Sequence, residues 1–119
     1  VRDLGCPIIP LMSKVLLIPL NGAIDTGRAE QLISAVLDSV SSTRATMVLI
    51  DLTGVPLVDS QVAQALIQVT HAVTLLGARV ILVGVRPEVA QSIVSLGIDL
   101  SSIRTMPTLA AALTLLQRG

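Results

Sequence analysis

Short runs of β-branched residues alternate along this chain with segments whose apolar residues have helical spacing. We predict five strands, near residues 8–10, 15–20, 46–51, 80–85 and, as a short edge strand, 103–105. The first two strands are separated by so few residues that no helical crossover fits between them, and we expect this pair to be antiparallel. The alternation predicts an α/β fold with a mixed four- to five-stranded sheet flanked by about four helices.

Two amphipathic helices are predicted before residue 80. Asp25 and Thr26 suit the cap of the first helix, because their side-chain oxygens can accept hydrogen bonds from free backbone N–H groups. The second helix begins at Asp59 or Ser60 and ends at Gly77, a C-cap glycine. The positions expected to be buried have three-and-four spacing: Ala29, Leu32, Ile33, Val36, Leu37 and Val40 in the first helix, and Val62, Ala63, Leu66, Val69, Val73 and Leu76 in the second.

Two shorter helices are predicted in the last third of the chain. Pro87 suits the first turn of the third helix, Glu88 lies near the positive end of its dipole, and Gly97 closes it. Pro107 or Thr108 begins the fourth helix, which covers residues 109–117. Its sides are apolar almost all round, so we expect it to be covered on more than one face.

The outward side of the second helix is unusual because it carries no charge. No Asp, Glu, Lys or Arg occurs from residue 60 to residue 78, and the outward positions are Gln61, Gln64, Gln68 and His71. Depletion of charged residues is typical of the centre of a protein interface. Chance in a chain with few charges is the alternative explanation.

Composition indicates one domain whose apolar surface is partly covered by other chains. The 119 residues, numbered 1–119, suffice for a single core. The hydrophobic fraction is 52%, the charged fraction is 13%, and the mean hydropathy is +0.84. The apolar stretches are far shorter than the ~20 residues of a membrane-spanning helix. We therefore expect no membrane insertion, and a homodimer or larger assembly.

Charge and aromatic content argue against nucleic acid as a partner, and the cysteine content bears on the expected location of the protein. The net charge is +0 and the chain has no Phe, Tyr or Trp, so both the electrostatic and the stacking components of nucleic-acid binding are missing. Cys6 is the single cysteine, and no signal-peptide pattern begins the chain, so we expect a cytoplasmic protein. Because the chain begins with Val1 rather than Met, an additional domain upstream is one alternative.

The candidate chemistry argues against an enzyme. His71 is the single histidine, and on one helix it lies roughly 16 Å from Ser60 at ~1.5 Å rise per residue, which excludes a Ser-His pair. Asp51 and Asp59 are too few for a metal site, and Lys14 is misplaced for a receiver-type phospho-aspartate site. No nucleotide-binding glycine motif occurs. We expect neither a metal nor a cofactor.

Ser60 is the most informative candidate because it offers a hydroxyl at a helix N-terminus. A phosphoryl group added there would meet backbone N–H donors and the positive end of the helix dipole. Capping is the alternative role, since serine after aspartate is a common helix start. Ser92 on the third helix is a weaker candidate and could be a small polar surface residue.

Six separated segments of the chain form a characteristic series. They are Pro-Ile-Ile-Pro at 7–10, Ile-Asp-Thr at 24–26, Ile-Asp-Leu-Thr-Gly-Val-Pro-Leu-Val-Asp-Ser at 50–60, Leu-Gly-Ala at 76–78, Val-Gly-Val-Arg-Pro-Glu-Val-Ala-Gln-Ser at 83–92 and Leu-Gly-Ile-Asp-Leu at 96–100. Together they resemble the STAS domain, and more closely the C-terminal STAS domain of RsbR-type stressosome proteins. The resemblance covers nearly the whole chain, as a single STAS domain over residues 1–119. It implies the STAS fold of anti-sigma factor antagonists.

The resemblance also implies a regulatory function without catalysis. In such proteins the STAS domain assembles with other STAS proteins and binds a serine/threonine switch kinase. The family's phosphate acceptors align with Ser60 and Ser92, and the partner-binding surface would comprise Asp59, Gln61, Gln64 and Gln68. RsbR-type chains usually have threonine at both acceptor positions, whereas the short RsbS scaffold has serine at the first.

Three alternatives remain open at this level. The chain could be a stand-alone RsbS-like scaffold rather than part of an RsbR-like chain, although the segments at 7–10 and 24–26 favour the latter. It could be the cytoplasmic STAS module of an anion transporter, which the full-length gene would reveal. A small α/β enzyme is the third alternative, and turnover that is lost on Ser60→Ala would support it.

Overall fold

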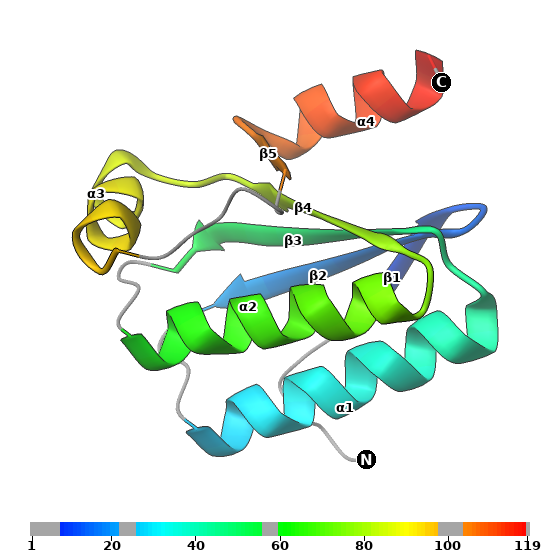
Figure 1. Ribbon diagram of the computed structural model, residues 1–119. Helices are drawn as coiled ribbons and strands as arrows, with labels where there is room; N and C mark the ends of the chain where they lie inside the picture. The colour runs from blue at the N-terminus through cyan, green and yellow to red at the C-terminus, as the bar shows by residue number, and fades with distance from the viewer. Residues whose placement is uncertain (1–7, 22–25, 56–59, 98–103, 119) are drawn as a thin grey trace.

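The computed structural model describes residues 8–21, 26–55, 60–97 and 104–118. These ranges contain five strands and four helices (Figure 1). The strands are β1 (Ile9–Met12), β2 (Val15–Asn21), β3 (Met47–Gly54), β4 (Arg79–Val83) and β5 (Arg104–Met106). The helices are α1 (Thr26–Thr43), α2 (Ser60–Leu75), α3 (Pro87–Ser95) and α4 (Leu109–Arg118).

The strands form one mixed sheet in the order β1-β2-β3-β4-β5. β1 is antiparallel to β2, as the short connection predicts, and the other neighbouring pairs are parallel. The connection between β1 and β2 turns at Lys14, which has φ 66°. The carbonyl of Lys14 accepts hydrogen bonds from the N–H groups of Thr46 and Met47, at 2.8 and 3.2 Å, and this ties the turn to the start of β3.

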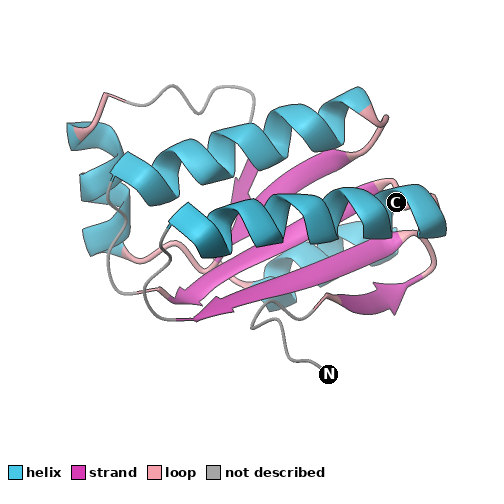
Figure 2. Ribbon diagram, turned by 90° about the horizontal axis from the view of Figure 1, so that it is seen from below, coloured by secondary structure: helices cyan, strands magenta, loops and turns pink. Residues whose placement is uncertain are grey.

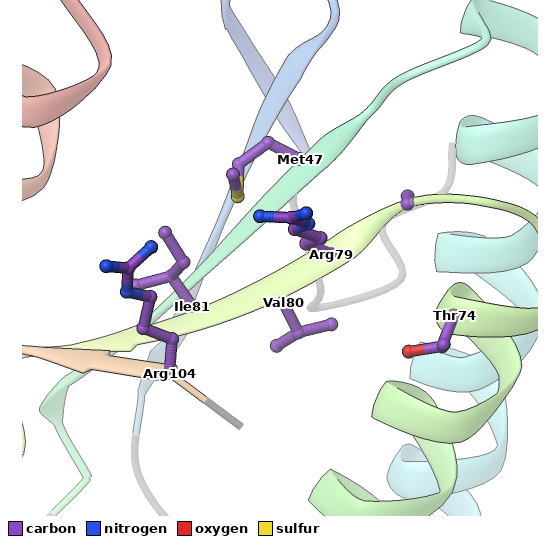
Figure 3. A pocket seen from close by; sticks show the side chains of 7 residues that line it. Met47, Thr74, Arg79, Val80, Ile81 and Arg104 are labelled. Carbon is purple, nitrogen blue, oxygen red and sulfur yellow. The ribbon is translucent and has the colours of Figure 1, made fainter. Parts of the chain in front are cut away.

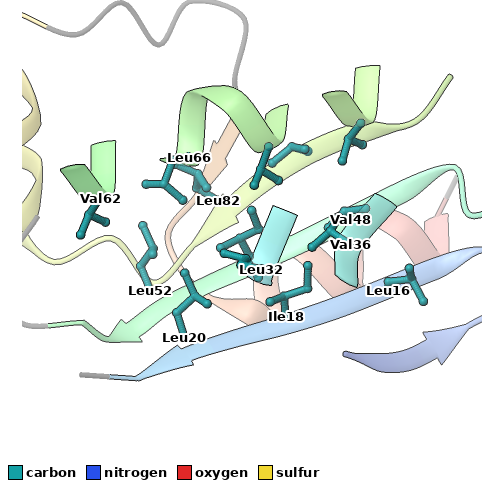
Figure 4. Packing of buried hydrophobic residues seen from close by; sticks show 14 of the residues in the cluster. Leu16, Ile18, Leu20, Leu32, Val36, Val48, Leu52, Val62, Leu66 and Leu82 are labelled. Carbon is teal, nitrogen blue, oxygen red and sulfur yellow. The ribbon is translucent and has the colours of Figure 1, made fainter. Parts of the chain in front are cut away.

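Helices lie on both faces of the sheet. α1 and α2 lie side by side on one face, α4 lies on the opposite face, and α3 lies beyond the end of the sheet (Figures 1 and 2). The face below α1 and α2 holds the larger core, in which Leu16, Ile18 and Leu20 of β2 pack with Leu32 and Leu66 (Figure 4). Alternate residues of the same strand, Val15 and Leu17, join the smaller core below α4.

Glycines end two of the helices as the sequence predicts. Gly77 has φ 90°, its N–H donates to the carbonyl of Thr74 at 3.0 Å, and the N–H of Ala78 donates to the carbonyl of Val73 at 3.1 Å. These two bonds form a Schellman motif. Gly97 after α3 has φ 69°, and its N–H donates to the carbonyl of Val94 at 3.0 Å.

Two expectations about burial are wrong. Leu76 is 49% exposed rather than buried, because it lies after the last helical residue of α2, in the turn that leads to β4. α4 is covered on one face rather than several: Ala112 is buried, whereas Ala110, Thr114 and Leu115 are exposed in the described structure. A helix packed on one side of a sheet has only that side covered, whatever its composition.

Candidate phosphorylation site and docking surface

The carboxyl end of β3 is held in shape by a short hydrogen bond within the strand. The N–H of Thr53 donates to Oδ1 of Asp51 at 2.9 Å, and the N–H of Val55 donates to the carbonyl of Leu52, also at 2.9 Å. Val55 is fully buried and anchors the end of this turn. These two bonds define the backbone conformation from Asp51 to Val55.

Gly84 brings the end of β4 against this turn. It has φ 71°, in the left-handed region where side chains are disfavoured. A Cβ atom built on Gly84 would overlap Oγ1 of Thr53, and would come within 2.9 Å of Oδ1 of Asp51 and 3.2 Å of the backbone nitrogen of Thr53. The strand predicted to reach residue 85 ends at Val83 because the backbone departs from extended geometry at Gly84.

Ser60 is the first residue of α2 and is exposed. Its position at the start of this helix agrees with the sequence prediction. Asp59, predicted to bind the partner, lies outside the described residues, as does Asp25, the predicted cap of α1. Ser60 follows β3 in the chain and so belongs to the carboxyl edge of the parallel strands.

The uncharged stripe of α2 is exposed along its length. Gln61, Gln64, Gln68 and His71 are all exposed, while the opposite side of the helix is buried against the sheet. The hydroxyl of the buried Thr70 donates to the carbonyl of Leu66 at 2.8 Å, so this polar atom is satisfied within the helix. The structure therefore leaves an uncharged, outward helix face beginning beside Ser60.

Leu75 extends the stripe beyond the four positions predicted from the sequence. It is 87% exposed, and with Gln61, Gln64, Gln68 and His71 it completes a series spaced by three and four residues. The same spacing that identifies the stripe could have identified this position. Leu75 therefore adds an exposed apolar side chain to the far end of a stripe that is otherwise made of polar residues.

Ser92 has a more restricted environment than Ser60. It is half-buried on α3, and its Oγ donates to the carbonyl of Glu88 at 3.1 Å. The helix begins with Pro87 after an extended Arg86, with no side-chain capping bond. To accept a phosphoryl group, the hydroxyl of Ser92 must first leave its bond to the helix backbone.

The single serine–histidine combination weighed in the sequence is too widely separated to act as a pair. Ser60 and His71 lie on one helix, eleven positions apart, so they are separated by roughly 16 Å at ~1.5 Å per residue. In the described part of the chain, no group of three or more His, Cys, Asp or Glu side chains could hold a metal ion. None of the helices described there is long and apolar enough to cross a membrane.

The mixed sheet with helices on both faces and an antiparallel first strand defines the fold of anti-sigma factor antagonists. A variant of RsbS from Moorella thermoacetica superposes with a TM-score of 0.81 at 24% identity, covering 95% of each chain. A chain in a solved structure of the stressosome superposes with a TM-score of 0.76 at 24% identity, and the match covers 94% of this chain and 96% of that one. Both comparisons confirm the predicted fold.

The sequence comparisons identify the family. The family model of the STAS domain matches residues 7–112, and the chain belongs to the STAS domain family. It is 48% identical over 108 residues to the RsbT co-antagonist protein RsbRA of Bacillus subtilis. The match covers 91% of this chain and 39% of RsbRA, so the chain spans less than half the length of that relative.

Proposed function

We propose that this chain is a non-catalytic regulatory domain that accepts phosphate at Ser60 and, by doing so, releases a serine/threonine switch kinase. The kinase would be RsbT-like, and the domain would act in the cytoplasm within a stressosome-type assembly of RsbR-like and RsbS-like STAS proteins. The observation that carries the proposal is the exposed hydroxyl of Ser60 at the start of a helix whose outward face has no charge. The similarity to an RsbT co-antagonist supports the choice of partner.

Docking of the unmodified domain would use the α2 stripe. Gln61, Gln64 and Gln68 can donate and accept hydrogen bonds without the large desolvation cost of burying a charge. Asp59, adjacent to Ser60 in the sequence, would supply a carboxylate at the rim of this surface. An uncharged face beside the acceptor hydroxyl therefore suits a partner that must bind, transfer phosphate and leave.

Phosphorylation would change the electrostatics of the surface at one point. Oγ of Ser60 would attack the γ-phosphorus of ATP, the bond to the β–γ bridging oxygen would break to release ADP, and the hydroxyl proton would pass to a base of the kinase. The product carries a charge of about −1.5 to −2, which the N-terminus of α2 stabilises through its dipole. The same charge is costly to desolvate inside an interface, so the modified domain keeps its fold and loses its partner.

Ser92 would be a second acceptor with a separate effect. Its hydroxyl is bound to the backbone of α3, and its side chain is half-buried. A phosphoryl group there would break this bond and add charge to the middle of a short helix. We therefore expect modification of Ser92 to perturb α3 locally, whereas modification of Ser60 changes the charge at the start of the α2 stripe.

The test is intact-mass analysis of the domain after incubation with an RsbT-like kinase and ATP, with the modified peptides mapped. We expect one phosphate on Ser60 in the wild type, and none at this position in Ser60→Ala. In binding measurements Ser60→Ala should keep its affinity for the kinase, while Ser60→Asp should bind at least about tenfold more weakly, a difference of about 1.4 kcal/mol. Equal affinity of the two variants would overturn the release mechanism.

A further inference from the structure

Basic side chains gather at the edge of the sheet where the parallel strands begin. Lys14 comes directly before β2, Arg44 lies shortly before β3, and β4 and β5 start with Arg79 and Arg104. All four residues are exposed. Each of the four parallel strands thus begins at or near a cation, in a chain whose formal net charge is +0.

A hollow of about 280 Å³ lies at this edge between the two arginines. Its described lining comprises Met47, Thr74, Ala78, Arg79, Val80, Ile81 and Arg104 (Figure 3). The side chains of Arg79 and Arg104 lie on the same side of the sheet as Met47 and Ile81, and Val80 lies on the other side with Thr74. The walls are largely apolar, and the two guanidinium groups provide the charge.

The strand register places the two arginines close to each other on one side of the sheet (Figure 3). Arg104 pairs with Ile81, and Ile81 lies two residues after Arg79 on the same side of β4. Strands are separated by ~4.8 Å and rise ~3.3 Å per residue, so the Cα atoms of the two arginines are about 8 Å apart. Two long side chains starting at this separation can both reach a single small anion.

No carboxylate offsets this charge within the described part of the chain. The acidic residues described there are Glu30 and Asp38 on α1, Asp51 at the carboxyl end of β3, and Glu88 on α3, and none of them lines the hollow. The register pairs Arg79 with Met47 and Arg104 with Ile81, so neither arginine has an acidic cross-strand partner among these residues. The carbonyls of Val73 and Thr74 at the end of α2 already accept hydrogen bonds from Ala78 and Gly77.

We propose that the hollow between Arg79 and Arg104 is a binding site for an oxyanion. Guanidinium groups bind phosphate and carboxylate groups through paired, charge-assisted hydrogen bonds, and two of them can share one anion. Lys14 and Arg44 raise the local positive potential and favour the approach of the ligand. The site lies at the amino ends of the strands, whereas Ser60 follows the carboxyl end of β3, so an oxyanion and a kinase can bind together.

The test is a titration of the labelled chain with inorganic phosphate, following the Nε–Hε signals of its arginines by NMR. A titration with sodium chloride at equal ionic strength controls for the screening of charges by salt. A parallel titration with sodium acetate tests whether a carboxylate binds at the same site. We expect saturable shifts of Arg79 and Arg104 with phosphate that chloride does not reproduce. Arg79→Gln and Arg104→Gln should each weaken phosphate binding about tenfold, the effect of losing a charge-assisted hydrogen bond.

Arg86→Gln is the matched control, because Arg86 is exposed at the start of α3, away from this edge. It should leave phosphate binding unchanged, and Lys14→Gln should weaken it by less than either hollow variant. Saturation by acetate rather than phosphate would support the site and assign its ligand to a carboxylate, such as an acidic side chain of another protein. Chemical-shift changes that do not saturate with either anion would overturn the proposal. So would a loss of phosphate affinity in Arg86→Gln as large as the loss in Arg79→Gln or Arg104→Gln.

Discussion

The hydroxyl oxygen of Thr53 occupies the place where a side chain on Gly84 would begin. This contact joins the ends of β3 and β4 at the edge of the sheet from which the chain continues to Ser60. The turn at the end of β3 is also held by the hydrogen bond that the N–H of Thr53 donates to Oδ1 of Asp51. The turn that precedes the proposed phosphorylation site is thus packed against a position where only glycine fits.

Gly84→Ala should destabilise the domain by about 1–3 kcal/mol, because the new Cβ atom meets both steric overlap and a left-handed backbone. Urea unfolding followed by circular dichroism measures the change. Gly77→Ala is the control: Gly77 has φ 90°, but nothing lies within 4 Å of its added Cβ atom, so only the backbone strain remains. Equal losses in the two variants would contradict the role of the contact with Thr53.

Removing the hydroxyl of Thr53 should partly rescue Gly84→Ala. The double variant Gly84→Ala, Thr53→Ala loses the closest contact but keeps the approach to Oδ1 of Asp51 at 2.9 Å. We expect the free energy of unfolding to recover by about 0.5–3 kcal/mol in a double-mutant cycle, as for residues in contact. Strict additivity of the two single changes would show that the overlap is relieved by movement elsewhere.

Gln64→Glu should weaken kinase binding about tenfold or more without loss of stability, because it adds a charge to the centre of the α2 stripe. Titration calorimetry with the kinase measures the affinity. Gln31→Glu makes the same chemical change at an exposed position of α1 and should have no effect. If both variants bind like the wild type, the stripe is not the docking surface.

Ser92 should be phosphorylated more slowly than Ser60 by the same kinase, because its hydroxyl donates to the carbonyl of Glu88 and its side chain is half-buried. A time course analysed by peptide mass spectrometry gives the two rates. We expect a difference of at least about fivefold, the population effect of a hydrogen bond worth about 1 kcal/mol. Faster modification of Ser92 would contradict this order.

The exposed leucines should identify the surface of self-association. Leu75 on α2 is 87% exposed and Leu115 on α4 is 38% exposed. These leucines lie on helices that cover opposite faces of the sheet (Figures 1 and 2). If the chain forms the expected homodimer, the one substitution of Leu75→Gln and Leu115→Gln that falls in its interface should shift the sedimentation coefficient towards that of a monomer. Both changes should alter stability by less than about 0.5 kcal/mol, as for ordinary surface substitutions. A monomeric wild type would contradict the expectation of self-association.

Much of the fold could be predicted from periodicity because burial on one face leaves a regular pattern in the sequence. The buried positions of α1 and most of those of α2 follow three-and-four spacing, and the short connection after Met12 requires an antiparallel pair. Gly77 and Gly97 mark helix ends through the backbone conformation they adopt. The uncharged stripe that contains Gln64 was also visible in the sequence, because a helix face is determined by local spacing alone.

Local sequence patterns specify which residues share a helix or a strand, whereas the packing of these elements against one another specifies which residues meet. Local spacing does not say how strands are ordered, so the contact of Gly84 with Thr53 and the pairing of Arg104 with Ile81, two residues from Arg79, became visible only in the sheet. The same reason explains why Leu76 and α4 are more exposed than their composition predicts. Apolar character favours burial, but only the packing of the whole chain provides a surface against which a side chain can be buried.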